Sequence, residues 1–212
     1  MSRNRPADYV IPQRIEKTLA LLVEGAAYVA TLSKMLDAHT AFAVQIFNFK
    51  QEGVTLRQYM KAFVRLKGFS KLEAIGVICD AEESHTGTSQ SVRDVFSGLG
   101  LPRPEASSSF THGPPRTGYL IVPDGKKSGC LEHAFLAACK NENLKISAEA
   151  FLKSVDDGER NDNWRAKVMV YAMIAGSEKP EATLATSMGL SLWDTNASAL
   201  CVMRDFAVGL CN

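Results

Sequence analysis

The feature that most constrains the fold is an alternation of short apolar runs with amphipathic stretches. The apolar runs have the length of buried strands and lie at residues 18–25, 42–49, 74–79 and 118–122. The intervening stretches have helical spacing and lie at residues 28–36, 55–66, 89–99 and 131–139. This alternation favours parallel strands joined by crossover helices. The sequence therefore predicts a layered α/β domain with a central, mostly parallel sheet of about four strands flanked by helices.

The last third of the chain is predicted to be helical. Residues 148–155, 164–174 and 197–210 have helical periodicity, and no convincing strand pattern occurs after Ser147. The helix at 89–99 is expected to be capped by Ser89 or Ser91. We therefore expect two parts, an α/β domain over residues 1–145 and a helical C-terminal extension over residues 146–212 that packs on it.

Composition is that of an ordinary globular protein, with 46% hydrophobic and 22% charged residues. The net charge of +1 excludes a basic character spread over the whole protein. No apolar run is long enough to span a bilayer, and the N-terminus lacks the apolar region of a signal peptide, which predicts a cytoplasmic protein without a membrane segment. Five cysteines and four histidines show no metal-ligand spacing, so buried reduced thiols are expected and a zinc site is not.

Acidic residues follow three of the predicted strands. They are Glu24 after the first, Asp80 and Glu82 after the third, and Asp124 after the fourth. Because ligands bind at the carboxyl ends of parallel strands, these side chains are expected to meet on one edge of the sheet. Carboxylates this close repel one another unless a cation neutralises them, and such oxygen ligands suit Mg²⁺. The pattern predicts bound Mg²⁺ or Mn²⁺, with an ordinary acidic loop as the alternative.

Two further residues lie in the turn after the fourth strand. Asp124 and Lys126 are additional candidates for the site, although Pro123 and Gly125 also fit a plain turn at Asp124.

Two other folds with acidic edges agree less well with the chain. A receiver domain needs a lysine on a fifth strand, and a haloacid-dehalogenase-like phosphatase places its acidic pair on the first strand. No P-loop, dinucleotide-binding fingerprint or nucleophile elbow occurs.

The order of these motifs resembles the Toprim domain of topoisomerases, primases, OLD-family nucleases and RecR-like repair proteins. That domain has an apolar strand ending in Glu-Gly, here LLVEG, and a later strand ending in an acidic pair, here IGVICDAE. The closer likeness is to small stand-alone Toprim-like proteins of unknown function, in which a strand ending in Pro-Asp precedes a G-x-L-E helix. Here this element is LIVPDGKKSGCLEHAFL, and the segments DNWRAKVMVYAM and LWDTNASALCVMRDF resemble that family's helical tail.

The resemblance implies a role for each matching residue. Glu24 would be the Toprim glutamate, which acts as a general acid or base and neighbours the metal. Asp80 and Glu82 would be the pair that holds Mg²⁺. Glu132 would match the glutamate on the helix after the fourth strand, with a solvated helix residue as the alternative. A metal held by such carboxylates stabilises charge on a phosphodiester and lowers the pKa of an attacking water.

Two departures from the Toprim pattern bear on activity. Ala26 and Ala27 follow Gly25, where that family and the OLD nucleases usually have a Lys or other polar residue and then an Asp. Glu82 replaces the second aspartate and reaches one methylene further. A weakened or inactive site is therefore one of the two outcomes that the sequence leaves open.

Two functional hypotheses follow. The first is a Mg²⁺-dependent, nuclease-like enzyme that cleaves phosphodiesters in nucleic acid together with a protein partner such as an ATPase, as in OLD nucleases and phage-defence systems. The second is a Toprim module without catalytic activity that binds nucleic acid, nucleotide or a partner protein. The chain lacks the tyrosine-bearing gate domain of a topoisomerase and the zinc-binding domain of a primase, so neither full reaction is expected. The oligomeric state stays open.

Overall fold

The computed structural model describes residues 14–36, 43–50 and 53–212. Its single sheet has the strand order β2-β1-β3-β4, and every neighbouring pair is parallel. The strands are β1 (Leu19–Val23), β2 (Val44–Asn48), β3 (Ala74–Asp80) and β4 (Arg116–Val122). The predicted α/β class with four parallel strands is confirmed. The expected start of the second strand at Phe42 lies outside the described residues.

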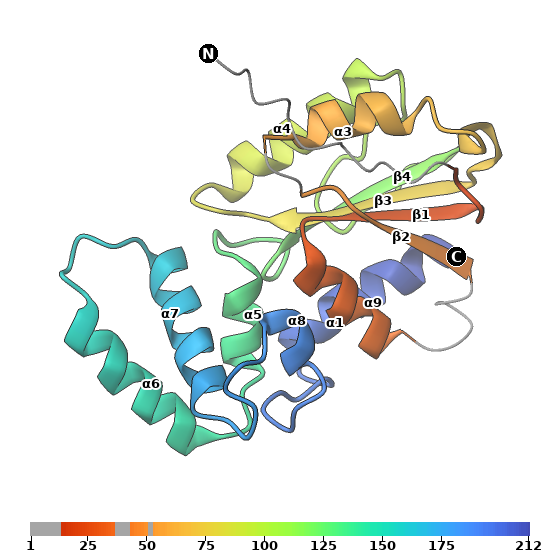
Figure 1. Ribbon diagram of the computed structural model, residues 1–212. Helices are drawn as coiled ribbons and strands as arrows, with labels where there is room; N and C mark the ends of the chain where they lie inside the picture. The colour runs from red at the N-terminus through yellow and green to blue at the C-terminus, as the bar shows by residue number, and fades with distance from the viewer. Residues whose placement is uncertain (1–13, 37–42, 51–52) are drawn as a thin grey trace, which may run out of the picture.

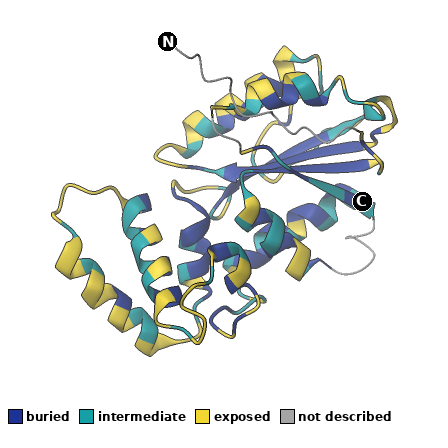
Figure 2. Cartoon of the chain, viewed as in Figure 1, coloured by how far each residue is buried: buried dark blue, intermediate teal, exposed yellow. Residues whose placement is uncertain are grey.

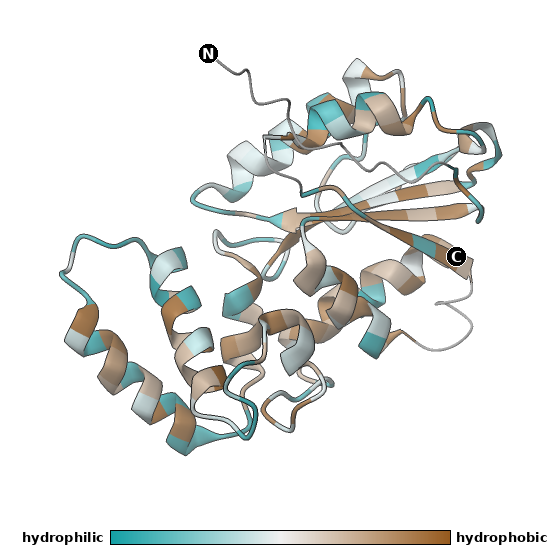
Figure 3. Ribbon diagram, in the orientation of Figure 1, coloured by the Kyte–Doolittle hydropathy of each residue, from teal (hydrophilic) through white to brown (hydrophobic). Residues whose placement is uncertain are grey.

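Helices cover both faces of this sheet (Figure 1). One face carries α3 (Leu56–Phe63) and α4 (His85–Gly98), and the other carries α1 (Ala26–Met35) and α9 (Ser198–Cys211). Along β1, Ala20 and Leu22 belong to the core under α3 and α4, whereas Leu21 belongs to the core under α1 and α9. Burial on both faces explains why β1 and β3 are nearly continuous apolar runs, which Figure 3 shows mostly in brown.

The remaining helices lie below the sheet in Figure 1. They are α5 (Leu131–Ala137), α6 (Glu142–Val155), α7 (Asp162–Ala175) and the short α8 (Leu184–Ser187). Helices α6 and α7 form a projecting hairpin, and α6 is mostly exposed (Figure 2). The expected boundary at residue 145 falls inside α6, and α9 returns to pack on the sheet. The C-terminal helices therefore share a core with β1, β3 and β4.

Helix α4 begins earlier than the sequence predicts. The side chain of Ser84 accepts a hydrogen bond from the backbone N–H of Gly87 and caps the helix, which starts at His85. The predicted cap at Ser89 or Ser91 is therefore wrong, and both residues lie inside the helix. The first turn carries His, Thr and Gly rather than apolar residues, so periodicity gave no signal there.

Two smaller expectations can be compared with the structure. All five cysteines carry free thiols; Cys79, Cys130 and Cys201 are buried, whereas Cys139 and Cys211 are only partly buried. Across the described part of the chain, no helix combines the length and the apolar character that a membrane crossing requires. A short 3₁₀ turn, η1 (Phe69–Lys71), precedes β3.

Candidate metal site at the carboxyl edge of the sheet

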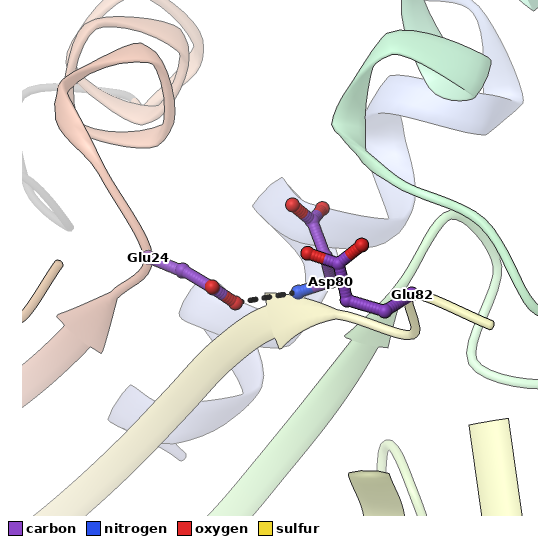
Figure 4. Close-up of side chains that lie close together, drawn as sticks. All are labelled: Glu24, Asp80 and Glu82. Atoms are coloured by element: carbon purple, nitrogen blue, oxygen red, sulfur yellow. Dashed lines mark hydrogen bonds between the residues drawn. The ribbon is translucent and has the colours of Figure 1, made fainter. Parts of the chain in front are cut away.

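Three carboxylates converge at the carboxyl ends of β1 and β3. Glu24 follows β1 directly, Asp80 is the last residue of β3, and Glu82 lies two residues beyond it. One oxygen from each side chain lies within 4.8 Å of the others, and no other such group occurs among the described residues. Figure 4 shows the three side chains together at this edge. The adjacent, parallel pairing of β1 with β3 is what brings them together.

The backbone at Glu82 adopts a left-handed conformation that positions its side chain. Its φ is 51°, a region that costs a residue with a Cβ about 1–2 kcal/mol. Two hydrogen bonds with Gly129 hold this conformation: Glu82 N–H donates to Gly129 O at 2.8 Å, and Gly129 N–H donates to Glu82 O at 2.9 Å. The loop after β3 is therefore fixed to the loop that leads into α5.

Asp80 is held in one orientation by two donors. Tyr28 Oη on α1 and the backbone N–H of Leu131 at the start of α5 both donate to Asp80 Oδ1, the latter at 2.8 Å. Burial is the main cause that raises the pKa of Asp80 to about 7; the neighbouring carboxylates add to the rise, and the hydrogen bond from Tyr28 opposes it. Asp80 therefore changes protonation near neutral pH.

Glu24 is paired with a lysine that the sequence interpretation missed. Lys50 Nζ, just beyond β2, donates to Glu24 Oε1 at 2.6 Å. The other oxygen, Oε2, accepts the backbone N–H of Asp80 at 3.1 Å, drawn as the dashed line in Figure 4. Burial lowers the pKa of Lys50, but the contact with Glu24 outweighs it and the pKa is raised. Because Lys50 lies just beyond the end of the second parallel strand, the edge rule that found Glu24 could have found it as well.

The start of α7 contacts the acidic loop. Asn163 Nδ2 donates to Glu82 Oε2 at 3.0 Å, and Asn161 Nδ2 donates to Glu83 Oε1 at 3.0 Å. Asn163 is buried although it is polar. The sequence offered no signal for these contacts, because the partners lie about 80 residues apart and have no shared motif.

Asp124 does not belong to the group of three converging carboxylates. Asp124 Oδ1 accepts the backbone N–H groups of Lys126 at 2.9 Å and Lys127 at 2.8 Å, and Oδ2 lies 3.8 Å from Lys127 Nζ. Slight burial raises the pKa of Asp124, but these backbone hydrogen bonds outweigh it and the pKa is lowered. Lys126 is exposed, and it contacts Asp124 through its backbone N–H. The geometry of Asp124 thus agrees with the alternative interpretation, in which it is a plain turn residue.

Glu132 on α5 is buried, with 8% of its surface exposed, so it is not a solvated helix residue. Its negative charge contributes to the raised pKa of Asp80. Burial also raises the pKa of the neighbouring Cys130 thiol, and Glu132 raises it further. Glu132 therefore lies close enough to influence Asp80 electrostatically, although it is outside the group of three converging oxygens.

A cleft of about 610 Å³ opens beside Glu24 and Lys50. Its walls come from the segment that leads into α3 and from α4, and they carry the hydroxyl groups of Thr55, Thr88 and Ser91 among apolar side chains. A polar ligand that reaches the carboxylates from this side would meet hydroxyl groups and one cation, Lys50. The cleft therefore links the acidic edge to the helices on the upper face of the sheet in Figure 1.

Fold and site together define an α/β protein with a carboxylate cluster at the carboxyl edge of a four-stranded parallel sheet. The chain belongs to the family described as "Protein of unknown function (DUF3226)", whose model matches residues 18–211. The match includes both the sheet and the C-terminal helices. Comparison with curated proteins and with solved structures found no match.

Proposed function

We propose that this protein is a Mg²⁺- or Mn²⁺-dependent enzyme that cleaves phosphodiesters in nucleic acid, acting in the cytoplasm with a protein partner such as an ATPase. The observation that carries the proposal is the convergence of Glu24, Asp80 and Glu82 within 4.8 Å. Three negative charges at this separation are unfavourable unless a cation compensates them. The resemblance of the same residues to the Toprim pattern supports this assignment.

The free oxygens of the cluster fit a hard divalent cation. Asp80 Oδ2 and Glu82 Oε1 accept no hydrogen bond from the described residues, whereas their partner oxygens are already occupied. Lys50 forms the one ion pair with the cluster that the described residues provide. One or two carboxylates completed by water and phosphate oxygens are the usual Mg²⁺ ligands. A cation held by Asp80 and Glu82 would stabilise charge on a phosphodiester oxygen and lower the pKa of an attacking water.

The protein side chains supply positioning and proton transfer. Tyr28 and the N–H of Leu131 fix the orientation of Asp80. Glu24 faces the cleft and lies beside the cluster, where a carboxylate can accept or donate a proton. Lys50, at the same cleft, neutralises Glu24 and can contact a phosphate oxygen.

One observation favours the second candidate, a Toprim-like module that binds nucleic acid, nucleotide or protein without cleavage. Helix α1 begins at Ala26 with no acidic residue in its first turn, and Gly25 provides no side-chain cap. The positions where the resembling nucleases carry polar groups are therefore apolar here. If those groups are needed for cleavage, the cluster would retain binding alone.

The deciding experiment measures nicking of supercoiled plasmid and degradation of single-stranded DNA and RNA with Mn²⁺, with and without an ATPase partner. Wild type is expected to cleave at least one substrate, and Asp80→Ala and Glu24→Ala to abolish cleavage, because these groups act on the transition state. Asp124→Ala is the matched control, since it removes a carboxylate from the same edge of the sheet. Equal loss in the control contradicts the site assignment. Nucleic-acid binding without cleavage by wild type would support the binding module instead.

A further inference from the structure

The helical layer on the upper face of the sheet in Figure 1 is strongly basic. Residues 53–72 and 84–103, which include α3, η1 and α4, contain seven Lys or Arg residues and one acidic residue, Asp94. The whole chain has 24 Lys or Arg and 23 Asp or Glu. These two segments thus carry a net charge of +6 and the rest of the chain −5, with Glu73 and Glu83 one residue outside their bounds.

Five of these basic residues lie in a 15-residue stretch that contains no acidic residue. They are Arg57, Lys61, Arg65, Lys67 and Lys71, and all five are exposed. No described carboxylate forms an ion pair with any of them. Their positive charge is therefore available to a ligand.

Three of the five form a stripe along the outer side of α3 and the turn that follows it. Arg57 and Lys61 are one helical turn apart, and Arg65 follows four residues later, just after the helix ends. At the rise of a helix the three span about 12 Å. The opposite side of α3 carries Tyr59, Met60 and Phe63, which are buried against the sheet. We call Arg57, Lys61 and Arg65 the basic stripe.

The basic stripe begins at the cleft beside the carboxylates. Thr55 and Leu56 line that cleft, and Arg57 is the next residue. Helix α4 contributes Thr88 and Ser91 to the same cleft and also carries Arg93, whose buried Nε has no hydrogen-bond partner among the described residues. The basic stripe therefore starts one residue beyond the cleft lining, with the Arg57 guanidinium beside Gly98 at the C-terminal end of α4.

We propose that the basic stripe binds the phosphate backbone of nucleic acid and leads it into the cleft beside Glu24. Arg and Lys contacts to phosphates supply binding that is independent of base sequence and sensitive to salt. An anionic membrane is a poorer fit, because the exposed large apolar side chains of the described residues lie on α6 and α7, away from this layer. The lead into the cleft rests on the proposed function, but binding by the stripe does not.

Fluorescence anisotropy of a labelled oligonucleotide in EDTA tests the proposal with the intact protein. The triple variant Arg57→Gln, Lys61→Gln, Arg65→Gln is compared with Lys140→Gln, Lys153→Gln, Lys179→Gln, which removes the same charge from exposed sites elsewhere. The stripe variant is expected to bind at least about tenfold more weakly, with the slope of log K against log salt reduced by up to about 3. Single-stranded and duplex probes show which backbone is preferred. The charge-conserving variant Arg57→Lys, Arg65→Lys should retain most of the affinity.

Equal weakening in the two triple variants would show that only net charge matters and would overturn the proposal. Unchanged binding by the stripe variant would do the same, as would binding to anionic lipid vesicles without binding to either oligonucleotide. Because no metal is present, the result is independent of catalysis. Normal stripe-dependent binding by a protein that cleaves nothing would refute the proposed enzyme and leave the stripe intact.

Discussion

The ends of β3 and β4 lie side by side on one edge of the sheet. Asp80 ends β3 and Asp124 lies two residues beyond β4, yet the environments of the two aspartates are opposite. Asp80 is partly buried, and burial is the main cause that raises its pKa to about 7. Asp124 is exposed, and its pKa is lowered because backbone N–H groups outweigh a slight desolvation. Two carboxylates that look equivalent in the sequence therefore have pKa values shifted in opposite directions, upward for Asp80 and downward for Asp124.

The difference shows that position at a strand end is not enough to define a site. Asp124 has its charge compensated within its own turn, by the N–H groups of Lys126 and Lys127. Asp80 faces Glu24 and Glu82 instead, and that repulsion is what an added cation would relieve. Charge that Lys50 compensates only in part, rather than location alone, distinguishes the candidate site.

The largest expected difference between the two aspartates is in metal binding. Asp80→Ala should weaken Mn²⁺ binding by about 100-fold or more, because changes even to groups behind the metal ligands cost 10–100-fold. Asp124→Ala should leave the affinity within about threefold of wild type, since that carboxylate is outside the cluster. Calorimetric titration measures both, and thermal melting shows whether each variant folds. Similar Mn²⁺ affinities in wild type and the Asp80 variant would show that Asp80 does not hold the metal and that the two aspartates do not differ in this respect.

A second difference should appear in stability without metal. Asp80→Asn should stabilise the protein above pH 7 by about 1–4 kcal/mol, because it removes a buried charge whose pKa is raised from 3.8 to about 7. The amide oxygen can still accept from Tyr28 and from the N–H of Leu131. Chemical denaturation at pH 8 in EDTA measures the change. A clear loss of stability would mean that the charged form of Asp80 is favourable in the folded state.

The pH dependence of stability tests the raised pKa of Asp80 directly. The folded-state pKa of Asp80 is above its unfolded value of 3.8, so the folded protein binds more protons between the two values. The contribution of Asp80 to the free energy of unfolding is therefore fully present below about pH 4 and is lost as the pH rises through about 7. Denaturation curves across this range should show that decline in wild type and a smaller one in Asp80→Asn. Parallel curves for the two proteins would contradict the raised pKa.

The sheet and two of the three carboxylate positions in the cluster could be predicted from the sequence by the pattern of strands alone. Parallel strands buried on both faces leave continuous apolar runs, and the edge rule then brings Glu24 and Asp80 together. The orientation of Asp80 was not accessible, because its donor Tyr28 is 52 residues away and lies on a helix. Such contacts depend on how helices dock, which periodicity does not encode.

The smallest expected effect is at Asp124, and its pH dependence has the opposite sign. The pKa of Asp124 is lowered in the folded state. Its contribution to the free energy of unfolding is therefore present above the unfolded pKa of 3.8 and is lost as the pH falls through the folded pKa. Asp124→Asn should cost less than about 1 kcal/mol at pH 7, because the exposed pair with Lys127 is weak and the amide oxygen can still accept both N–H groups. Denaturation of Asp124→Asn, of Lys127→Gln and of the double variant isolates the pair. If Asp124→Asn instead raised stability at neutral pH, as expected for Asp80→Asn, the two strand ends would be electrostatically alike and the contrast between them would fail.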